Sequence, residues 1–415
     1  MNDRLTGRLR VPAIAVCGVD FGWGSAGKLA AILAATAQHG GLRTIVLGTQ
    51  LGRPVLAGAR VDAWYEKWPR SPAALRSLLR RHGVAAGLVV LDPSAAERLE
   101  DVGVPTVYVD SIPYIWTRAD PVPTQVTAYC AQRGADLPEE SRAALAPVAR
   151  LMWIDAILPE RRGRMTAGAR TAVLNFGGLH SPTNMSGNPH YLALVAAPSI
   201  RALADAGYRH IEVCGNVSAA ELAASAVADG VSMRIGSRTH EDFTAILSAA
   251  DLLLTSPGLT TLLEASTVGT PTLCLPPQNL SQVFNGQRFA SAFGNECLIA
   301  WPRNTLDLNR LAKVRRRGED VALRFINDCL AARHPIDIHV MLYEKISQGI
   351  NFAVDPAREW GALADHSGRH GAWQVAALLC QLVTSGKIPA GSEIDENRGY
   401  QCAAHAAPER AEDGS

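Results

Sequence analysis

The chain has 415 residues, which is too long for one ordinary core and suggests two domains with additional elements. Hydrophobic residues make up 47% and charged residues 19%, a globular composition that excludes a disordered chain or a fibre. The 40 Lys and Arg residues balance 39 Asp and Glu, which disfavours a protein that coats nucleic acid or a membrane surface.

Cysteine usage and the opening segment indicate the compartment. The 8 cysteines are scattered without a CxxC pair, which argues against a zinc ribbon or a disulfide framework and fits a reducing environment. The opening MNDRLTGRLRVPAIAV is charged and lacks the apolar region and cleavage site of a secretory signal. No apolar run approaches the roughly 20 residues of a membrane span. We expect a soluble, cytoplasmic protein.

The first part of the chain alternates strands with helices. Strands are expected at residues 13–19, 44–48, 88–91 and 106–109. The first is a continuous apolar run, which is typical of a strand buried on both faces of a parallel sheet. A glycine-rich turn follows at residues 20–27, and then a helix from Lys28 to about His39 that ends at two glycines. This half therefore predicts an open, mostly parallel α/β sheet.

A second α/β unit follows a basic, aperiodic stretch at residues 161–164, where we expect a linker. Its expected strands are residues 171–176, 210–214, 231–235, 252–254 and 272–275. Its expected helices include residues 191–206, 242–249 and 260–268. The sequence thus predicts an α/β protein with two tandem Rossmann-like, doubly wound domains. Ligands of such sheets bind outside the carboxyl ends of the strands, here in the interdomain cleft.

The glycine-rich turn has several interpretations. Gly22 to Gly27 satisfy the G-x-G-x-x-G spacing between a strand and a helix. An NAD site also needs an acidic residue at the end of the second strand, but that strand ends in Gly48-Thr49-Gln50 and has no acid there. With Lys28 the turn satisfies a Walker A loop, yet Leu29 stands where Ser or Thr would bind Mg²⁺. The turn also suits a nucleotide-sugar transferase, or a tight turn with a packing glycine. By itself it leaves these alternatives open.

The most informative segment is ADLLLTSPGLTTLLEASTVGTPTLCLPP, residues 250–277. A buried strand ends in Ser-Pro-Gly, and the next helix begins with Thr260 and Thr261, whose N–H groups and hydroxyls suit a diphosphate. Glu264 lies one turn further on the same side, where a carboxylate suits ribose hydroxyls. The polar residues 278–285 could bind sugar hydroxyls. The alternative is an ordinary strand–helix junction with a surface glutamate.

This run, followed by Gln and Asn residues, resembles the donor-binding segment of GT-B glycosyltransferases, such as the N-acetylglucosaminyltransferase of peptidoglycan lipid-intermediate synthesis. The resemblance extends over most of residues 12–385 and is strongest at 250–290. It implies that Glu264 binds the donor ribose and that Gln282 faces the donor sugar. The other donor-binding residues expected are Gly177, Gly178, Ile235, Ser256, Gly258, Thr260, Thr261 and Asn285.

Two features depart from the GT-B relatives. Many of them carry His at the position of Lys28, which leaves Asp20, at the end of the first strand, as the candidate acid/base residue. Its alternative role is to cap the turn or the first helix. The chain also has no Asp-x-Asp pair. We therefore expect an inverting enzyme without metal or cofactor, in which helix and backbone dipoles stabilise the leaving group.

The opening VDFGWGSAGKLAAIL, residues 19–33, resembles the start of the cytosylglucuronate and hydroxymethylcytosylglucuronate synthases of peptidyl-nucleoside antibiotic pathways. The resemblance implies transfer of glucuronate from UDP-glucuronate to the ring nitrogen of free cytosine or hydroxymethylcytosine. Asp20 would accept the proton of that nitrogen. Phe21 and Trp23 offer an aromatic platform for the flat base, with core packing as the alternative for both. Together with Lys28 they are the expected acceptor-binding residues.

Charged and histidine side chains complete the candidate site. The glucuronate carboxylate needs a cation, and Lys28, Arg53 and Arg288 are candidates, with a solvated surface role as the alternative for the two arginines. His180 and His190 flank a loop near the expected phosphates, where each could stabilise the diphosphate or bond the loop.

The predicted organisation has four segments. They are an N-terminal acceptor-binding domain (1–165), a C-terminal nucleotide-sugar-binding domain (166–345), helices that pack back toward the first domain (346–388) and a disordered tail (389–415). Alternatives to the predicted function are a transferase for another small acceptor, a UDP-N-acetylhexosamine epimerase on the same fold, and a nucleotide-sugar-binding protein without turnover.

Overall fold

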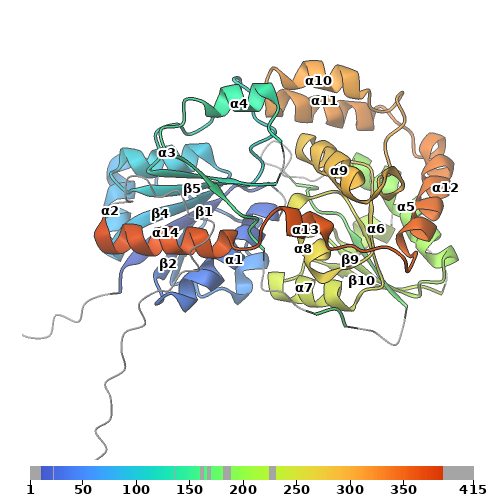
Figure 1. The fold of residues 1–415 in the computed structure, drawn as a ribbon, viewed down its shortest axis with the longest axis horizontal. Helices are drawn as coiled ribbons and strands as arrows, with labels where there is room; N and C mark the ends of the chain where they lie inside the picture. Colours follow the sequence, from blue (N-terminus) through green and yellow to red (C-terminus); the bar gives the residue numbers. More distant parts are fainter. Residues whose placement is uncertain are drawn as a thin grey trace, which may run out of the picture.

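Two parallel sheets flanked by helices lie side by side in the computed structural model of the protein (Figure 1). The structure describes residues 11–21, 23–134, 136–158, 163–165, 170–180, 188–223 and 230–386. Within these ranges every pairing of neighbouring strands is parallel. The predicted α/β class with two doubly wound sheets is confirmed.

The first sheet, over the described residues, has 7 strands in the order β3-β2-β1-β4-β5-β6-β7. They are β1 (Ala13–Gly18), β2 (Arg43–Leu47), β3 (Ala63–Tyr65), β4 (Val84–Val90), β5 (Thr106–Asp110), β6 (Ala128–Gln132) and β7 (Leu151–Ile154). All of β1 is buried, as its continuous apolar run predicts. The strand order reverses between β1 and β4, and such a switch point opens a crevice at the carboxyl ends of the strands.

The second sheet repeats this topology. The described part of it has 5 strands in the order β10-β9-β8-β11-β12. They are β8 (Thr171–Asn175), β9 (His210–Cys214), β10 (Ser232–Gly236), β11 (Leu252–Thr255) and β12 (Thr272–Cys274). Its switch point lies between β8 and β11. Each half therefore has one crevice of this kind, at the carboxyl ends of its strands.

Helices cover both sheets. In the first half these are α1 (Gly24–Gln38), the 3₁₀ helix η1 (Val55–Gly58), α2 (Pro72–His82), α3 (Pro93–Asp101) and α4 (Glu139–Leu145). In the second half they are α5 (Pro189–Asp205), α6 (Ala219–Ala223), α7 (His240–Ala249), α8 (Leu259–Val268), α9 (Leu280–Phe293) and the 3₁₀ helix η2 (Asn295–Cys297). The helices that follow are α10 (Leu308–Arg315), α11 (Glu319–Ala331), α12 (Ile336–Ala353), α13 (Ala362–His366) and α14 (Gly371–Ser385).

The structure differs from the sequence prediction at several boundaries. Helix α1 begins at Gly24 rather than Lys28, because the Gly27 N–H donates to the Trp23 carbonyl (2.9 Å) and closes a helical turn within the glycine-rich segment. Strands β3, β6 and β7 were not predicted. Two of them span only 3 and 4 residues, too few to give a clear hydrophobic period.

The C-terminal helices divide between the halves. Helix α14 returns to the first half and packs on α1 and β4, whereas α12 packs on α5 and α13 packs on α8 (Figure 1). The start of α14 is hydrogen-bonded to the segment that follows β7, because the Gly371 N–H donates to the Ala156 carbonyl at 3.2 Å. The predicted tail at 389–415 lies outside the described residues, as does residue 166, where the predicted second domain begins.

The start of α14 gives a test of this packing. A Cβ added at Gly371 would lie 2.2 Å from the Asp155 carbonyl oxygen, a backbone atom that cannot rotate away. We expect Gly371→Ala to lower the Tm by roughly 2–10 °C in a thermal melt, because overpacking of this kind strains the backbone. Gly58→Ala is the control, since a Cβ there meets nothing within 4 Å. Equal melting temperatures for the two variants would contradict the prediction.

Candidate functional site

A cavity lies between the two halves, at the carboxyl ends of strands from both sheets. It encloses about 1180 Å³ when the open space at its mouth is counted. Both switch points contribute to its lining, through Val19 and Leu91 in the first half and Asn175 in the second. The predicted site residues that line it are Phe21, Trp23, Lys28, Gly177, Gly178, Gly258, Thr260, Thr261, Glu264, Gln282 and Asn285.

The glycine-rich turn faces helix α8 of the other half. A Cβ at Gly24 would lie 3.5 Å from the Thr260 hydroxyl oxygen, and one at Gly27 would lie 3.4 Å from the Thr260 methyl group. The Thr260 hydroxyl also donates to the Gly24 carbonyl at 3.4 Å. These are ordinary van der Waals distances, so the first turn of α1 packs directly against α8, which agrees with the cleft-facing interpretation of the motif. Gly22 lies outside the described residues.

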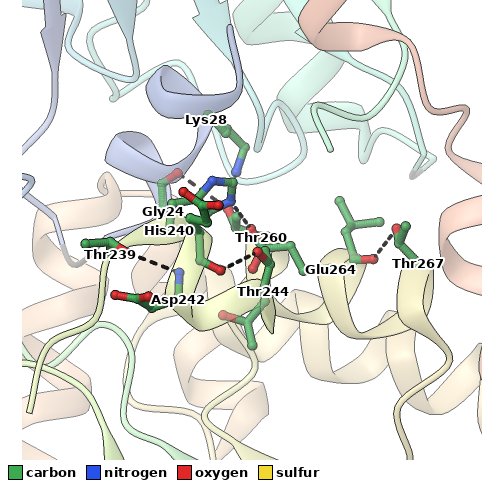
Figure 2. A network of polar contacts seen from close by, with 12 residues as sticks. Gly24, Lys28, Thr239, His240, Asp242, Thr244, Thr260, Glu264 and Thr267 are labelled. Carbon is green, nitrogen blue, oxygen red and sulfur yellow. Dashed lines mark hydrogen bonds and ion pairs between the residues drawn. The ribbon is translucent and has the colours of Figure 1, made fainter. Parts of the chain in front are cut away.

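Lys28 crosses from one half to the other. Its Nζ donates a hydrogen bond to the Thr260 hydroxyl, and the side chain is almost fully buried (Figure 2). Burial lowers the pKa of Lys28 from its ordinary 10.5 to about 8, and the nearby Glu264 carboxylate opposes this shift. A cation that is so little hydrated and so close to the start of α8 is well suited to an anionic ligand.

Glu264 lies beside Lys28 and is paired with a histidine. Its Oε1 is 2.8 Å from Nε2 of His240, the first residue of α7 (Figure 2). The Glu264 side chain is only 3% exposed, so this carboxylate is not the surface glutamate of the alternative interpretation. The Thr239 hydroxyl accepts the Asp242 N–H at 3.1 Å and caps α7, which fixes the position of His240.

The loop after β8 is held by a cluster of polar side chains. The Gly177 carbonyl accepts hydrogen bonds from the Ser256 hydroxyl (2.7 Å) and from the amides of Gln278 and Gln282 (3.0 Å each). Gly178 has a φ of +91°, which favours glycine. The side-chain oxygen of Gln282 (Oε1) also accepts the backbone N–H of Gln278 at 3.0 Å. Gln282 thus lines the cavity with its amide already fixed, and Ser256 supports the loop from outside the lining.

Asn285 joins the two halves at a second point. Its side-chain oxygen accepts a hydrogen bond from the Tyr114 hydroxyl of the first half, and its amide donates to the Pro257 carbonyl at 3.0 Å. Burial raises the pKa of Tyr114 well above its usual range, so the phenol remains a donor. Asn285 therefore connects the loop after β5 to the turn before α8, and it lines the cavity at that junction.

Asp20 lies outside the cavity lining. Its carboxylate accepts the backbone N–H groups of Gln50 (3.2 Å) and Leu51 (3.0 Å), which ties the end of β1 to the loop after β2. Burial raises its pKa, while those two hydrogen bonds oppose the shift. This geometry is that of the turn-capping alternative, with Phe21, the next residue, in the lining.

The other candidate residues lie elsewhere. Ile235 is partly buried within β10 and does not line the cavity. Arg53 pairs with Glu66 at 2.8 Å on the surface. Arg288 donates to the Ser367 hydroxyl at 2.9 Å, away from the lining. Of the three predicted cations, only Lys28 lines the cavity.

The two loop histidines also lie outside the lining. Burial lowers the pKa of His180, which follows the Gly177–Gly178 turn, and His190 is exposed near the start of α5.

Several lining residues, His240 among them, were not site candidates in the sequence analysis. Asn175, the last residue of β8, donates to the hydroxyls of Thr255 (2.9 Å) and Thr261 (3.4 Å). A polar residue at the end of a buried strand was a usable signal for it. Ser111, Trp116 and Glu319 also line the cavity. No sequence pattern indicated Glu319 as a site residue, because it reaches the first half only through the tertiary packing of α11.

Among the described residues, no group of three or more His, Cys, Asp or Glu side chains could hold a metal ion. No helix in this part of the chain is long and apolar enough to cross a membrane.

A family model described as "CGA synthase-related protein" matches residues 55–304, more than half of the chain. The chain belongs to this CGA synthase-related family. The family predicted from residues 19–33 is thereby confirmed, although the matched range begins after that segment and contains residues 250–290 instead. No curated protein sequence matches this family member.

Solved structures resemble the CGA synthase-related chain at low identity. A putative UDP-N-acetylglucosamine 2-epimerase from Listeria monocytogenes superposes with a TM-score of 0.50 at 10% identity, over 92% of this chain and 98% of that one. MurG from Acinetobacter baumannii gives 0.48 at 13% identity over 89% and 99% of the two chains. UGT89C1 from Arabidopsis thaliana complexed with UDP gives 0.48 at 15% over 89% and 99%. The fold is the predicted GT-B fold.

The buried lysine leads to a stability prediction. Between pH 8 and 10.5 the unfolded chain holds more protons than the folded chain, because Lys28 has the lower pKa in the folded state. The loss of folding stability caused by the buried Lys28 charge is therefore complete below about pH 8 and disappears as the pH approaches 10.5. We expect Lys28→Met to raise the Tm of the ligand-free protein at pH 7, since it removes a buried charge that costs on the order of 3 kcal/mol after the attraction of Glu264 is included and before the contact with Thr260 is counted.

The measurement is a series of thermal melts between pH 7 and 10.5. Lys313→Met is the matched control, because Lys313 is exposed on α10. A gain in Tm that stays constant over this pH range would contradict the prediction.

Proposed function

We propose that the protein is a glycosyltransferase that moves glucuronate from UDP-glucuronate to the ring nitrogen of free cytosine or hydroxymethylcytosine. The observation that carries the proposal is a single cavity with two chemically different walls. The second half contributes Thr260, Thr261 and Glu264 near the start of α8, and the first half contributes an aromatic, apolar wall with Phe21 and Trp23. The family match supports this activity.

The donor belongs on the wall made by α8. Gly258 is the N-cap and has no side chain to accept the first N–H groups of the helix, which leaves them for the donor diphosphate. The hydroxyls of Thr260 and Thr261 lie next to them. His240 occupies Oε1 of Glu264, and Oε2 can accept a ribose hydroxyl. Gly177 and Gly178 close over the phosphates from the end of β8.

Lys28 is the cation that we assign to the anionic part of the donor. It lines the cavity from the first half and contacts α8 through Thr260. A diphosphate or glucuronate carboxylate beside it would compensate the buried charge and raise its pKa again. Closure of the two halves on the donor would then be coupled to the formation of a buried ion pair, which strengthens as water leaves the cavity.

The reaction needs a base for the attacking ring nitrogen, and we keep Asp20 as the candidate. Asp20 immediately precedes Phe21 of the cavity lining, and burial shifts its pKa upward, the direction that a general base at neutral pH requires. The nitrogen attacks the anomeric carbon as the bond to UDP breaks, through a transition state with oxocarbenium character. The α8 dipole and Lys28 would stabilise the negative charge on the departing UDP.

The reaction is tested by measuring UDP release from UDP-glucuronate, with and without free cytosine, followed by the mass of the product. We expect release that depends on cytosine and an adduct of cytosine and glucuronate. Release without cytosine would contradict the transfer and point to hydrolysis, and release from UDP-N-acetylglucosamine alone would favour an epimerase. UDP binding without release from either donor would favour a nucleotide-sugar-binding protein.

Asp20→Asn tests the proposed base. The asparagine oxygen can still accept a backbone N–H of the loop after β2, so the fold should persist, but the side chain can no longer take a proton. We expect the transfer rate to fall by about 10²–10⁴-fold while UDP affinity stays within about twofold. Transfer at the wild-type rate would assign Asp20 to capping alone.

A further inference from the structure

Ser111 has an unpaired hydroxyl in the wall of the cavity. The residue follows β5, is 2% exposed, and its Oγ has no hydrogen-bond partner within the part of the chain that the structure describes. It nevertheless lines the cavity. A buried polar group without a partner is unfavourable, so a native protein retains one mainly where a bound water or ligand completes its bonding.

Trp116 gives this part of the cavity a flat, apolar surface with a fixed orientation. Its indole N–H donates to Oδ2 of Asp110 at 2.7 Å, and the Tyr129 hydroxyl donates to the same oxygen at 2.7 Å. Oδ1 of Asp110 accepts the Ile112 N–H at 2.9 Å. Because the polar edge of the indole is bonded to Asp110, the ring contributes its carbon surface to the lining.

Glu319 comes from the other half and is held against the same loop. Its backbone N–H donates to Oδ1 of Asp120 at 2.6 Å, and Oδ2 of Asp120 accepts the N–H and hydroxyl of Thr117 at 2.8 Å each. Arg315 reinforces the contact through the carbonyls of Tyr114 and Ile115 at 3.4 Å. The first residue of α11 is therefore fixed relative to Trp116, although the two are far apart in the sequence.

Glu319 lines the cavity, and its carboxyl group has no hydrogen-bond donor among the described residues. The residue is partly buried, and desolvation raises the pKa of its carboxyl group to about 8, with further contributions from Asp120, Asp320 and Asp110. The charged form therefore lacks stabilisation in the ligand-free protein. Whether protonated or not, the group keeps an oxygen that can accept a hydrogen bond from a ligand.

We propose that Ser111, Trp116 and Glu319 form the acceptor subsite, in which Glu319 accepts a hydrogen bond from an exocyclic amino group of a flat heterocycle. The inference rests on the proposed function and deepens it, because it names the residues that select the acceptor. Trp116 supplies the surface for the ring, and Ser111 bonds a ring nitrogen or carbonyl. Ring positions 1 and 4 of a pyrimidine are opposite each other, so an amino group held at position 4 leaves N1 at the far end for the sugar.

The experiment compares two ligands that differ only in the amino group, cytosine and pyrimidin-2-one. Their affinities are measured by calorimetry on the full-length protein in the presence of saturating UDP. For the wild type we expect cytosine to bind at least about tenfold more tightly, the effect of one good hydrogen bond to a carboxyl group. Glu319→Leu should reduce this ratio to about one by weakening cytosine alone. Ser111→Ala should weaken both ligands by a similar factor.

Asp320→Leu is the matched control, because it removes a carboxyl group from the adjacent, exposed position of the same helix. It should preserve the ratio. A Glu319→Leu variant that binds UDP normally and still prefers cytosine tenfold would overturn the inference, as would a wild type without preference or without affinity for either base. Cytosine-dependent UDP release in those cases would leave the proposed function intact. Absence of UDP binding and release by the wild type would instead reject the proposed function and the subsite together.

Discussion

The approach of α1 to α8 is the contact on which the site depends. Two glycines of the first helical turn leave room for Thr260, and Lys28 reaches across to its hydroxyl. A Cβ at either glycine would already lie at van der Waals distance from Thr260, so a side chain longer than that of alanine would press on α8. The hydrogen bond from Lys28 to Thr260 joins the halves at the same place. The first turn of α1 and the start of α8 thus form the contact that connects the two walls of the cavity.

Electrostatics in the cavity follow from its enclosure. Lys28 and Glu264 are both buried near each other, and desolvation shifts the lysine strongly toward its neutral form. Burial likewise favours the neutral form of the Glu319 carboxyl group, whose pKa it raises to about 8. Such groups are costly in an empty site and become favourable when a ligand supplies the missing partner. The ligand-free cavity is therefore preorganised for charged and hydrogen-bonding ligands.

The polar residues around α9 hold loops of the protein in place, and Gln282 and Asn285 among them also line the cavity. Gln278 and Gln282 both donate to the Gly177 carbonyl, and Asn285 connects Tyr114 with Pro257. These amides hold loops in place, and their bonding capacity is largely used within the protein. The same residue types that bind sugars can also fix the loops that cover them, and only the contacts distinguish the two roles.

Much of the architecture was readable from local patterns. Continuous apolar runs predicted β1 and β11 because strands of a parallel sheet are buried on both faces. The order strand, Ser-Pro-Gly, threonine pair and glutamate predicted the polar start of α8, because helix geometry fixes the spacing between Thr260 and Glu264. These features depend on neighbours within a few residues, so the sequence alone determines them.

Tertiary packing decided which of the candidate residues share a cavity. Asp20 and Phe21 are adjacent in the chain, yet the backbone N–H groups at Gln50 and Leu51 hold Asp20 outside the lining. Glu319 enters the cavity because Asp120, about 200 positions earlier, binds its backbone. Such contacts join segments that no periodicity relates, since they arise only when two sheets and their returning helices pack together. The sequence determined the sheets and the polar start of α8, and the fold decided which residues form the opposite wall of the cavity.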